Sequence, residues 1–279
     1  MGVCLRGISG GCVRIVLMAD SVSMPSCGDA DFNLECSMGT GDGRSGNRKR
    51  EVGGAAGILG HAIAETPIAV LDFETTGLSP GLDRVVEVSV VRVDPGGGPP
   101  RLVLDTLVNP ERPMAATEVH GIRGAHVRNA PRFHEIAGEL VRATAGCVVA
   151  AYNAYFDMKF LEFELGLSGI RQLPPFFCLM YLRPMLDLGV RCSLEQACQA
   201  HGHPYVATHA AADDAMASAE LYRIYAGEIS RRSVQTFGDL ARLRRYRFVE
   251  SFRREPLSEP QHAAMTRGRL VSRSIAVGG

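Results

Sequence analysis

Two acidic residues end an otherwise apolar run, and this run limits how the chain can fold. Residues 67–74 are β-branched and apolar apart from Asp72 and Glu74, a pattern typical of a strand. The two carboxylates are two residues apart, so they point to the same face of that strand. Carboxylates are rarely buried unless they are paired or bound to a metal. The run therefore predicts either a solvated strand end or a site for a hard divalent cation.

Two more strand patterns follow at short intervals. Residues 84–93 alternate in side-chain character, and residues 102–108 form a third apolar run. Turn signals rich in glycine and proline separate the three runs, at residues 75–81 and 94–98. Strands joined by such short connections predict an antiparallel meander.

The second half of the chain alternates between helical and strand patterns. Further strands are predicted over residues 148–152 and 176–180. Helices are predicted over residues 117–122, 132–144, 156–167, 193–201, 213–229 and 237–252. Hairpins followed by this alternation predict an α/β fold, with a mixed five-stranded sheet flanked by helices.

Acidic residues and a histidine stand at two further junctions. Asp157 lies where the predicted strand 148–152 passes into a helix, a usual position for an α/β site. The alternative is that Asp157 only complements the dipole of that helix. His209 precedes the last alanine-rich helix, and Asp213 and Asp214 lie in its first turn. An imidazole suits general-base catalysis at neutral pH, but either aspartate also fits a helix cap.

In this order, the acidic motifs resemble those of the DEDDh exonucleases, or DnaQ-like family, which includes the proofreading epsilon subunit of DNA polymerase III. The similarity is carried by residues 70–78, 119–122, 153–157 and 209–214. It extends over about residues 66–226. The resemblance implies a ribonuclease-H-like exonuclease fold.

The resemblance also implies a catalytic centre with two divalent ions, Mg²⁺ or Mn²⁺. Asp72, Glu74 and Asp214 would hold the ion that activates water, and the family's spacing selects Asp214 over Asp213. Asp72 and Asp157 would help to hold the second ion, beside the leaving 3′ oxygen. His209 would accept the proton of the attacking water.

A pocket for the terminal nucleotide is expected beside these groups. Its predicted residues are Phe73, Thr75, Leu78, His120, Asn153 and Phe156. For the two phenylalanines, core packing is the alternative, which we favour for Phe73, whereas we expect Phe156 at the pocket edge. Tyr152 and Arg123 depart from the family pattern, in which histidine and threonine are common, and both departures bear on substrate preference.

The distribution of charge divides the chain into three parts. Residues 1–62 are rich in glycine and serine and are predicted to be disordered, before an exonuclease domain over residues 63–229. Residues 230–279 are predicted to form a basic helical extension. Residues 228–279 carry 11 basic and 5 acidic side chains, although the whole chain has a net charge of zero. This tail suits either a polyanion or a solvated helix face.

The combined prediction is a 3′→5′ exonuclease that releases nucleoside 5′-monophosphates from DNA and acts in proofreading. The alternatives are an RNA-trimming exoribonuclease and a non-catalytic nucleic-acid-binding module on the same fold. The expected partners are single-stranded or 3′-terminal nucleic acid and, for the tail, a DNA polymerase or clamp.

No apolar run is long enough to span a membrane. The eight cysteines lack metal-site spacing, which fits a reducing cytoplasm, and three of them, Cys178, Cys192 and Cys198, are expected to be small buried residues.

Overall fold

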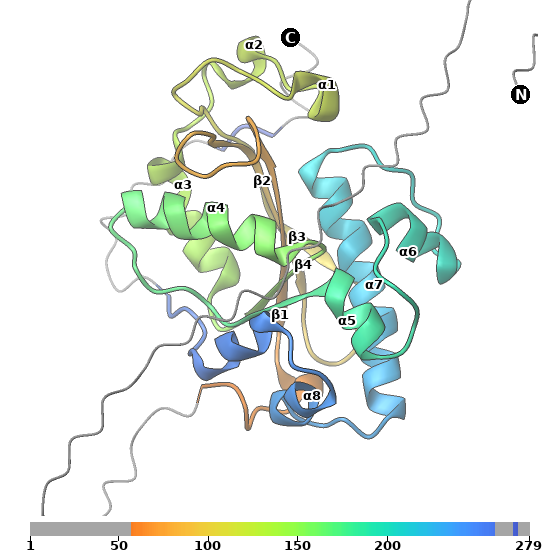
Figure 1. Cartoon of the computed structure of the whole chain (residues 1–279). Helices are drawn as coiled ribbons and strands as arrows, with labels where there is room; N and C mark the ends of the chain where they lie inside the picture. Colours follow the sequence, from red (N-terminus) through yellow and green to blue (C-terminus); the bar gives the residue numbers. More distant parts are fainter. Residues whose placement is uncertain (1–56, 260–269, 273–279) are drawn as a thin grey trace, which may run out of the picture. The chain divides into compact units, whose positions relative to one another are not determined.

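A five-stranded mixed sheet forms the centre of the fold (Figure 1). The computed structural model of the chain describes residues 57–259 and 270–272. The sheet has the order β3-β2-β1-β4-β5. Its strands are β1 (Ile68–Thr75), β2 (Val85–Val93), β3 (Arg101–Leu107), β4 (Val148–Ala151) and β5 (Phe176–Cys178). The predicted α/β class and the mixed five-stranded sheet are confirmed.

The strand β1 lies at the centre of the sheet and joins its two halves. It pairs antiparallel with β2, which pairs antiparallel with β3, and it pairs parallel with β4. Strand β5 continues the parallel half beside β4. Because β1, β4 and β5 are parallel, their carboxyl ends lie at one edge of the sheet, where an α/β fold places its site.

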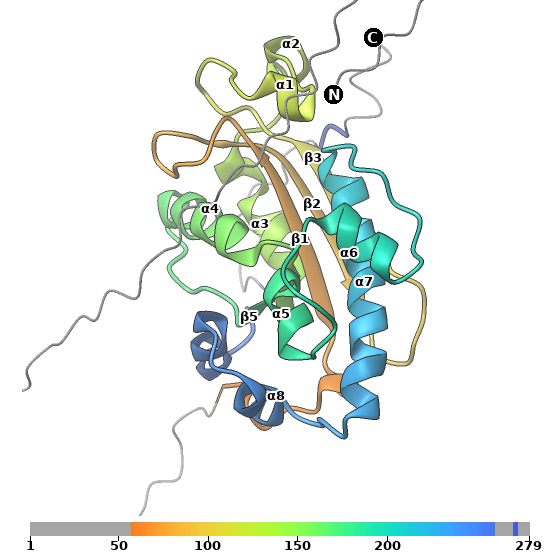
Figure 2. The same cartoon turned by 45° about the vertical axis from the view of Figure 1, so that its right-hand side comes forward.

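Helices cover both faces of this sheet. The long helix α7 (Ala211–Arg231) packs on β1 and β2, whereas α3 (Phe133–Thr144) and α4 (Ala154–Leu167) lie on the other side (Figure 2). The shorter helices are α1 (Thr117–His120), α2 (Gly124–Val127), α5 (Leu179–Met185) and α6 (Leu194–Ala200). Strand β1 therefore lies between two helical layers, which explains why its sequence is almost continuously apolar.

Several elements differ from the sequence prediction. Helices α2 and α5 were not predicted, and α5 replaces the last two residues of the strand expected over 176–180. The expected helix over 237–252 is wrong: the chain forms α8 (Phe237–Leu243) and a separate 3-10 helix, η2 (Arg247–Arg253). The break occurs at Arg244, whose backbone is extended. It lets the rings of Phe237 and Phe252 meet at 5.3 Å between centroids.

The folded part begins before the predicted boundary at residue 62. Ile58 is fully buried, and its N–H donates to the carbonyl of Phe252 over 2.8 Å. Gly57 has a φ of 57°, and a Cβ there would meet the backbone of Arg253 at 2.4 Å. Residues 57–62, followed by the 3-10 helix η1 (Ile63–Glu65), therefore belong to the packed fold. The rest of the extension predicted over 1–62 lies outside the described residues.

The described helices include none that is both long and apolar enough to cross a membrane. Cys178 and Cys198 are buried as expected, whereas Cys192 is partly exposed.

Candidate active site

Asp72 and Glu74 lie on β1 and face helix α7. In the β1–β2 register, Asp72 is opposite Ser89 and Glu74 is opposite Glu87. Directly paired residues share a face of the sheet, and the carboxylate of Glu87 reaches the N–H of Ala211 at the start of α7. The two candidate ligands therefore point to the space at the amino end of α7.

The environment of Asp72 disfavours a negative charge. Burial raises the pKa of its carboxyl well above the usual range, and the charges of Asp157, Glu74, Asp214 and Glu87 raise the pKa further. Several carboxylates thus lie within electrostatic reach of one another. Such an arrangement is unfavourable unless protons or metal ions neutralise it.

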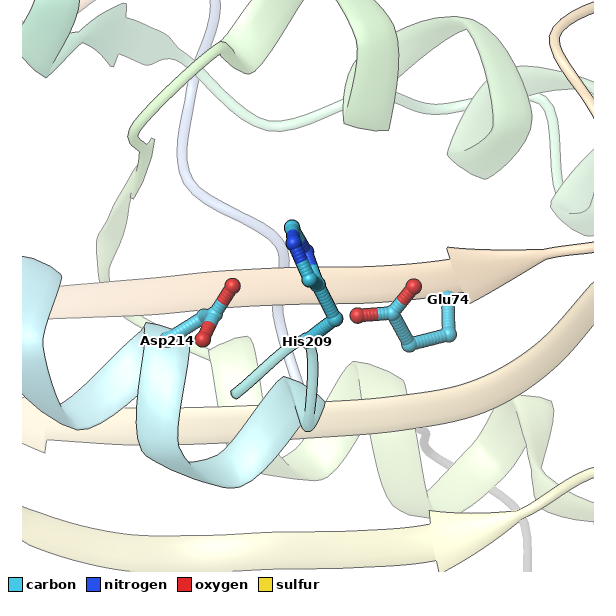
Figure 3. A group of neighbouring side chains, drawn as sticks. All are labelled: Glu74, His209 and Asp214. Carbon is cyan, nitrogen blue, oxygen red and sulfur yellow. The ribbon is translucent and has the colours of Figure 1, made fainter. Parts of the chain in front are cut away.

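Three groups at this place have the geometry of a metal site. Glu74, His209 and Asp214 each offer a ligand atom, and these atoms all lie within 4.8 Å of one another. Figure 3 shows that they come from β1, from the segment before α7 and from α7 itself. His209 is exposed and has a left-handed backbone, with a φ of 49°. This uncommon conformation turns the chain into α7 and places the imidazole beside the two carboxylates.

The structure distinguishes the two neighbouring aspartates of α7. Asp213 is exposed, and its carboxylate accepts a hydrogen bond from Thr208 Oγ1 over 3.0 Å. Asp214 is partly buried and belongs to the group with Glu74 and His209. It also accepts a hydrogen bond from the hydroxyl of Tyr205. The position of Asp214 agrees with the family spacing.

Asp157 approaches the same place from α4. It lies in the first turn of the helix and is 4% exposed. Its Oδ1 accepts the backbone N–H of Phe73 over 3.2 Å, which holds α4 against β1 beside Asp72. Burial raises the pKa of Asp157 to about 7, although hydrogen bonds from backbone N–H groups oppose the shift. The five predicted catalytic residues thus come together from β1, α4 and the amino end of α7.

Two residues of this region were missed in the sequence. Glu87 is 1% exposed, and its Oε2 accepts the N–H of Ala211 over 3.0 Å. An acidic residue in the apolar run of β2 is the same signal that identified Asp72. Tyr205, which bonds to Asp214, lies in an irregular loop, where neither periodicity nor a motif indicates its position.

The six predicted pocket residues fall into two groups. The side chains of Phe73, Thr75 and His120 are 4%, 7% and 2% exposed, respectively. Phe73 packs edge-on against Phe133, in agreement with the core interpretation. A nucleotide would reach these three side chains only if they moved.

The second group is open to solvent. Leu78 is 81% exposed, Asn153 is exposed at the start of α4, and Phe156 is partly exposed beside Phe160. Of the two departures from the family pattern, Tyr152 is buried and donates to the carbonyl of Cys192 over 2.7 Å, whereas Arg123 is exposed.

The donors present fit divalent cations. Carboxylate oxygens are the ligands that Mg²⁺ prefers, and Mn²⁺ also accepts an imidazole. A divalent cation would offset the mutual repulsion of these carboxylates, whose charges, together with burial, raise the pKa of Asp72.

Comparison with known proteins agrees with this geometry. The family model described as Exonuclease (RNase_T) matches residues 69–222, more than half of the chain. The chain belongs to the exonuclease family. Within this family, all five predicted catalytic residues fall inside the matched segment.

Relatives of this exonuclease-family chain include subunits of DNA polymerases. It is 35% identical over 198 residues to a DNA polymerase III subunit epsilon-like protein of Rhodobacter capsulatus, covering 63% of this chain but 27% of the relative. It is 31% identical over 169 residues to the DNA polymerase III subunit epsilon of Rickettsia typhi, covering 55% of this chain and 71% of the relative. The predicted resemblance to this subunit is confirmed.

A solved structure shares the fold of the family domain. A full-length 3′-exonuclease superposes with a TM-score of 0.50 and 17% identity, covering 63% of this chain and 64% of that one. The complex of exonuclease X with 5′-overhanging duplex DNA matches with a TM-score of 0.46 and 22% identity, covering 63% of this chain and 98% of that one.

Proposed function

We propose that the protein is a metal-dependent 3′→5′ exonuclease that releases nucleoside 5′-monophosphates from the 3′ end of DNA. The proposal rests on one observation above all: the ligand atoms of Glu74, His209 and Asp214 lie within 4.8 Å of one another, near the partly exposed Asp72 and the buried Asp157. Membership of the exonuclease family supports the same reaction class.

The carboxylates act as ligands in this proposal. Asp72, Glu74 and Asp214 hold one divalent ion, and Asp72 and Asp157 help to hold a second. Bound there, the ions supply a more acidic water and a positive charge for the developing charge on the phosphate oxygens. The protein fixes the directions of the ligands through the Phe73–Asp157 hydrogen bond and the bond from Tyr205 to Asp214.

His209 is the proposed general base. Its imidazole lies beside Glu74 and Asp214 and is exposed, so it can accept a proton from an attacking water and pass it to solvent. A well-placed base of this kind contributes roughly 10²–10⁴-fold to the rate.

The exposed members of the predicted pocket are proposed to grip the terminal nucleotide. Leu78 and Phe156 offer apolar surface against a base, and Asn153 offers hydrogen bonds next to them. Three predicted pocket residues have buried side chains, and they are proposed to support the pocket from inside the fold: Phe73, Thr75 and His120.

DNA is the proposed substrate because the relatives are named as subunits of DNA polymerase III. The same names support a DNA polymerase as partner, proofreading as the role and the cytoplasm as the location. The chain covers 27% of the length of the Rhodobacter relative, so these assignments extend only to the exonuclease part.

The direct test is the degradation of 5′-labelled single-stranded DNA and RNA of equal sequence in the presence of Mn²⁺. We expect a ladder that shortens from the 3′ end, is faster on DNA and is abolished by a chelator, by Asp72→Ala and by Asp214→Ala. Asp213→Ala is the matched control: its carboxylate is exposed and bonds to Thr208, so this variant should remain active.

Different results would contradict different parts of the proposal. Faster degradation of RNA would assign RNA instead of DNA as the substrate and support the exoribonuclease alternative. If neither DNA nor RNA is cleaved although Mn²⁺ still binds, the result would support the alternative of a non-catalytic nucleic-acid-binding module. Equal loss in Asp213→Ala and Asp214→Ala would remove the assigned role of Asp214.

A further inference from the structure

A surface of arginines and tyrosines lies beside the candidate active site, and its core is formed by Tyr181, Tyr246, Arg191, Arg244, Arg245 and Arg247. We call these six residues the basic–aromatic surface. Tyr181 lies on α5, Arg191 lies in the loop after it, and the other four lie at and after the break between α8 and η2. Figure 2 shows α5 in front of the sheet, above α8.

The arginines of this surface are exposed, and the carboxylate of Asp187 acts on Arg244 only through its charge, without forming an ion pair with it. Among the described residues, Arg191, Arg244 and Arg245 form no ion pair with an acidic side chain, and the same is true of Arg247. By contrast, Arg242 in the same segment pairs with Asp239 over 2.7 Å. Clustered guanidinium groups of this kind repel one another, and a polyanion would neutralise them.

The tyrosines form a continuous path of ring contacts. The ring of Tyr181 lies 5.0 Å from that of Tyr246, and on its other side it lies 5.4 Å from that of Tyr155. All three side chains are partly exposed. Arginine groups flank the path: Arg191 lies 4.8 Å above the ring of Tyr181 and donates to its hydroxyl, and Arg244 donates to the hydroxyl of Tyr246.

This path ends at Tyr155, in the first turn of the helix that also carries Asp157. Tyr155 is two residues before Asp157 on α4 and adjacent to the pocket residue Phe156. The first turn of α5 is also fixed at this place, because the N–H of Met180 donates to the carbonyl of Tyr152 over 3.0 Å. The basic–aromatic surface therefore adjoins the first turn of α4, the helix that carries Asp157 and Phe156.

The arginines at the α8–η2 break lie outside the part of the chain that matches the family. The match ends at residue 222, whereas Arg244, Arg245, Tyr246 and Arg247 follow it. Packing holds their segment in place: Phe248 is buried, and its N–H donates to the hydroxyl of Tyr155 over 3.0 Å. The segment that carries these four residues thus lies beyond the matched family domain and is attached directly to α4.

We propose that the basic–aromatic surface binds the single strand upstream of its 3′ end, with phosphates against the arginines and bases against the tyrosine rings. Aromatic stacking combined with a positively charged groove is the usual chemistry for holding single strands without regard to sequence. This inference rests on the proposed function, since it assumes a strand whose 3′ end occupies the neighbouring site. It gives the C-terminal segment a role in affinity for long strands and none in bond cleavage.

The test compares two triple variants of the full chain. Arg244→Gln, Arg245→Gln and Arg247→Gln are combined in one variant. The matched control combines Arg101→Gln, Arg223→Gln and Arg231→Gln, which remove the same charge from exposed ion pairs elsewhere. All six positions are exposed, so both proteins should fold, which thermal unfolding verifies.

Binding of a labelled oligothymidylate of about 16 nucleotides is measured without added metal over a range of salt concentrations. We expect the dissociation constant of the surface variant to rise roughly tenfold at moderate salt, and its salt slope to fall by about 2 for three lost phosphate contacts. The control should change either quantity much less. Hydrolysis of a dinucleotide, which has no strand upstream of its single phosphodiester, should be unchanged in both variants.

Each outcome decides one question. Equal affinity of both variants for the oligothymidylate would overturn the proposed nucleic-acid surface and favour an acidic protein as its occupant. A surface variant with impaired dinucleotide hydrolysis would also overturn it, because these arginines would then act on catalysis. If the wild-type protein degrades neither the dinucleotide nor a long strand, the proposed function fails, but the binding measurement still decides the role of the surface.

Discussion

Arg84 and Glu164 form a bidentate ion pair that connects helix α4 to the start of β2. Arg84 Nε and Nη2 donate to Glu164 Oε1 and Oε2 over 2.7 and 2.8 Å. The side chain of Glu164 is 1% exposed, whereas that of Arg84 is 21% exposed. Because α4 also carries Asp157, this pair fixes one wall of the candidate site from a distance.

Glu164→Gln is expected to destabilise the protein by about 2–3 kcal/mol of unfolding free energy, since it leaves Arg84 without its charged partner. Solvent reaching Arg84 keeps the loss below that of a fully buried pair. The measurement is denaturant unfolding, and Glu162→Gln, an exposed position on the same helix, is the control. A loss no larger than that of the control would show that the pair contributes little.

Asp83 holds the loop between β1 and β2, next to the candidate site. A hydrogen bond from the N–H of Ser79 lowers the pKa of Asp83, and bonds from Thr76 and Arg112 lower it further, against the opposing effect of burial. A folded-state pKa below the unfolded value means that the stabilisation is complete above the unfolded pKa of about 3.9 and is lost as the pH falls through the folded pKa.

Asp83→Asn should therefore destabilise the protein near neutral pH and reduce the loss of stability on acidification. The difference in unfolding free energy between wild type and variant should be constant above about pH 5 and should shrink below about pH 4. Unfolding measured across this range checks the prediction. A difference that does not depend on pH would mean that the charge of Asp83 has no part in holding the loop.

Much of the sheet was predictable because its strands are buried on both faces or alternate strictly. Strands β1 and β2 have apolar runs bounded by glycine and proline turns, and their observed bounds differ from the prediction by one residue. The C-terminal segment was not predictable in this way. Its helical pattern continues through Arg244, and only the contact between Phe237 and Phe252 shows why the chain breaks there.

The candidate site was predictable in its motifs but not in its surroundings. Carboxylates in an apolar strand identified Asp72 and Glu74, and the resemblance supplied the choice of Asp214 over Asp213. The backbone of His209 and the bond from Tyr205 to Asp214 depend on a loop without a regular pattern. Glu87 carried a usable signal, but the alternation of side chains along its strand led to a purely structural interpretation.

Asp72→Asn should separate stability from function. Burial, followed by the charges of Asp157, Glu74, Asp214 and Glu87, raises the pKa of Asp72, so the neutral amide relieves repulsion in the metal-free protein. We expect an unchanged or higher melting temperature without metal, together with a loss of activity of roughly a thousandfold.

The same variant tests the metal site directly. Mn²⁺ at about a hundred times its dissociation constant should stabilise the wild-type protein by about 2.7 kcal/mol, and the variant much less. Thermal unfolding with and without Mn²⁺ gives both values. Equal stabilisation of the two proteins would show that Asp72 is not a ligand.

Glu87→Gln should weaken metal binding although Glu87 is not one of the proposed metal ligands. The buried carboxylate accepts the N–H of Ala211 at the positive end of the α7 dipole, an interaction worth about 1–2 kcal/mol at a partly buried site. Glutamine keeps the shape but loses the charge, so the start of α7, which carries Asp214, should be held less firmly. We expect a loss of Mn²⁺ affinity of roughly tenfold, as for other residues that orient metal ligands.

Asp213→Asn is the control that separates the loosening of α7 from the simple loss of a negative charge. It removes one charge from the first turn of the same helix, but at an exposed side chain that bonds to Thr208. Isothermal titration of Mn²⁺ into both variants gives the comparison. If the Mn²⁺ affinities of the two variants fall equally, Glu87 acts only through its charge. A larger fall in Glu87→Gln would show that Glu87 positions Asp214, because only this variant loosens the helix that carries that ligand.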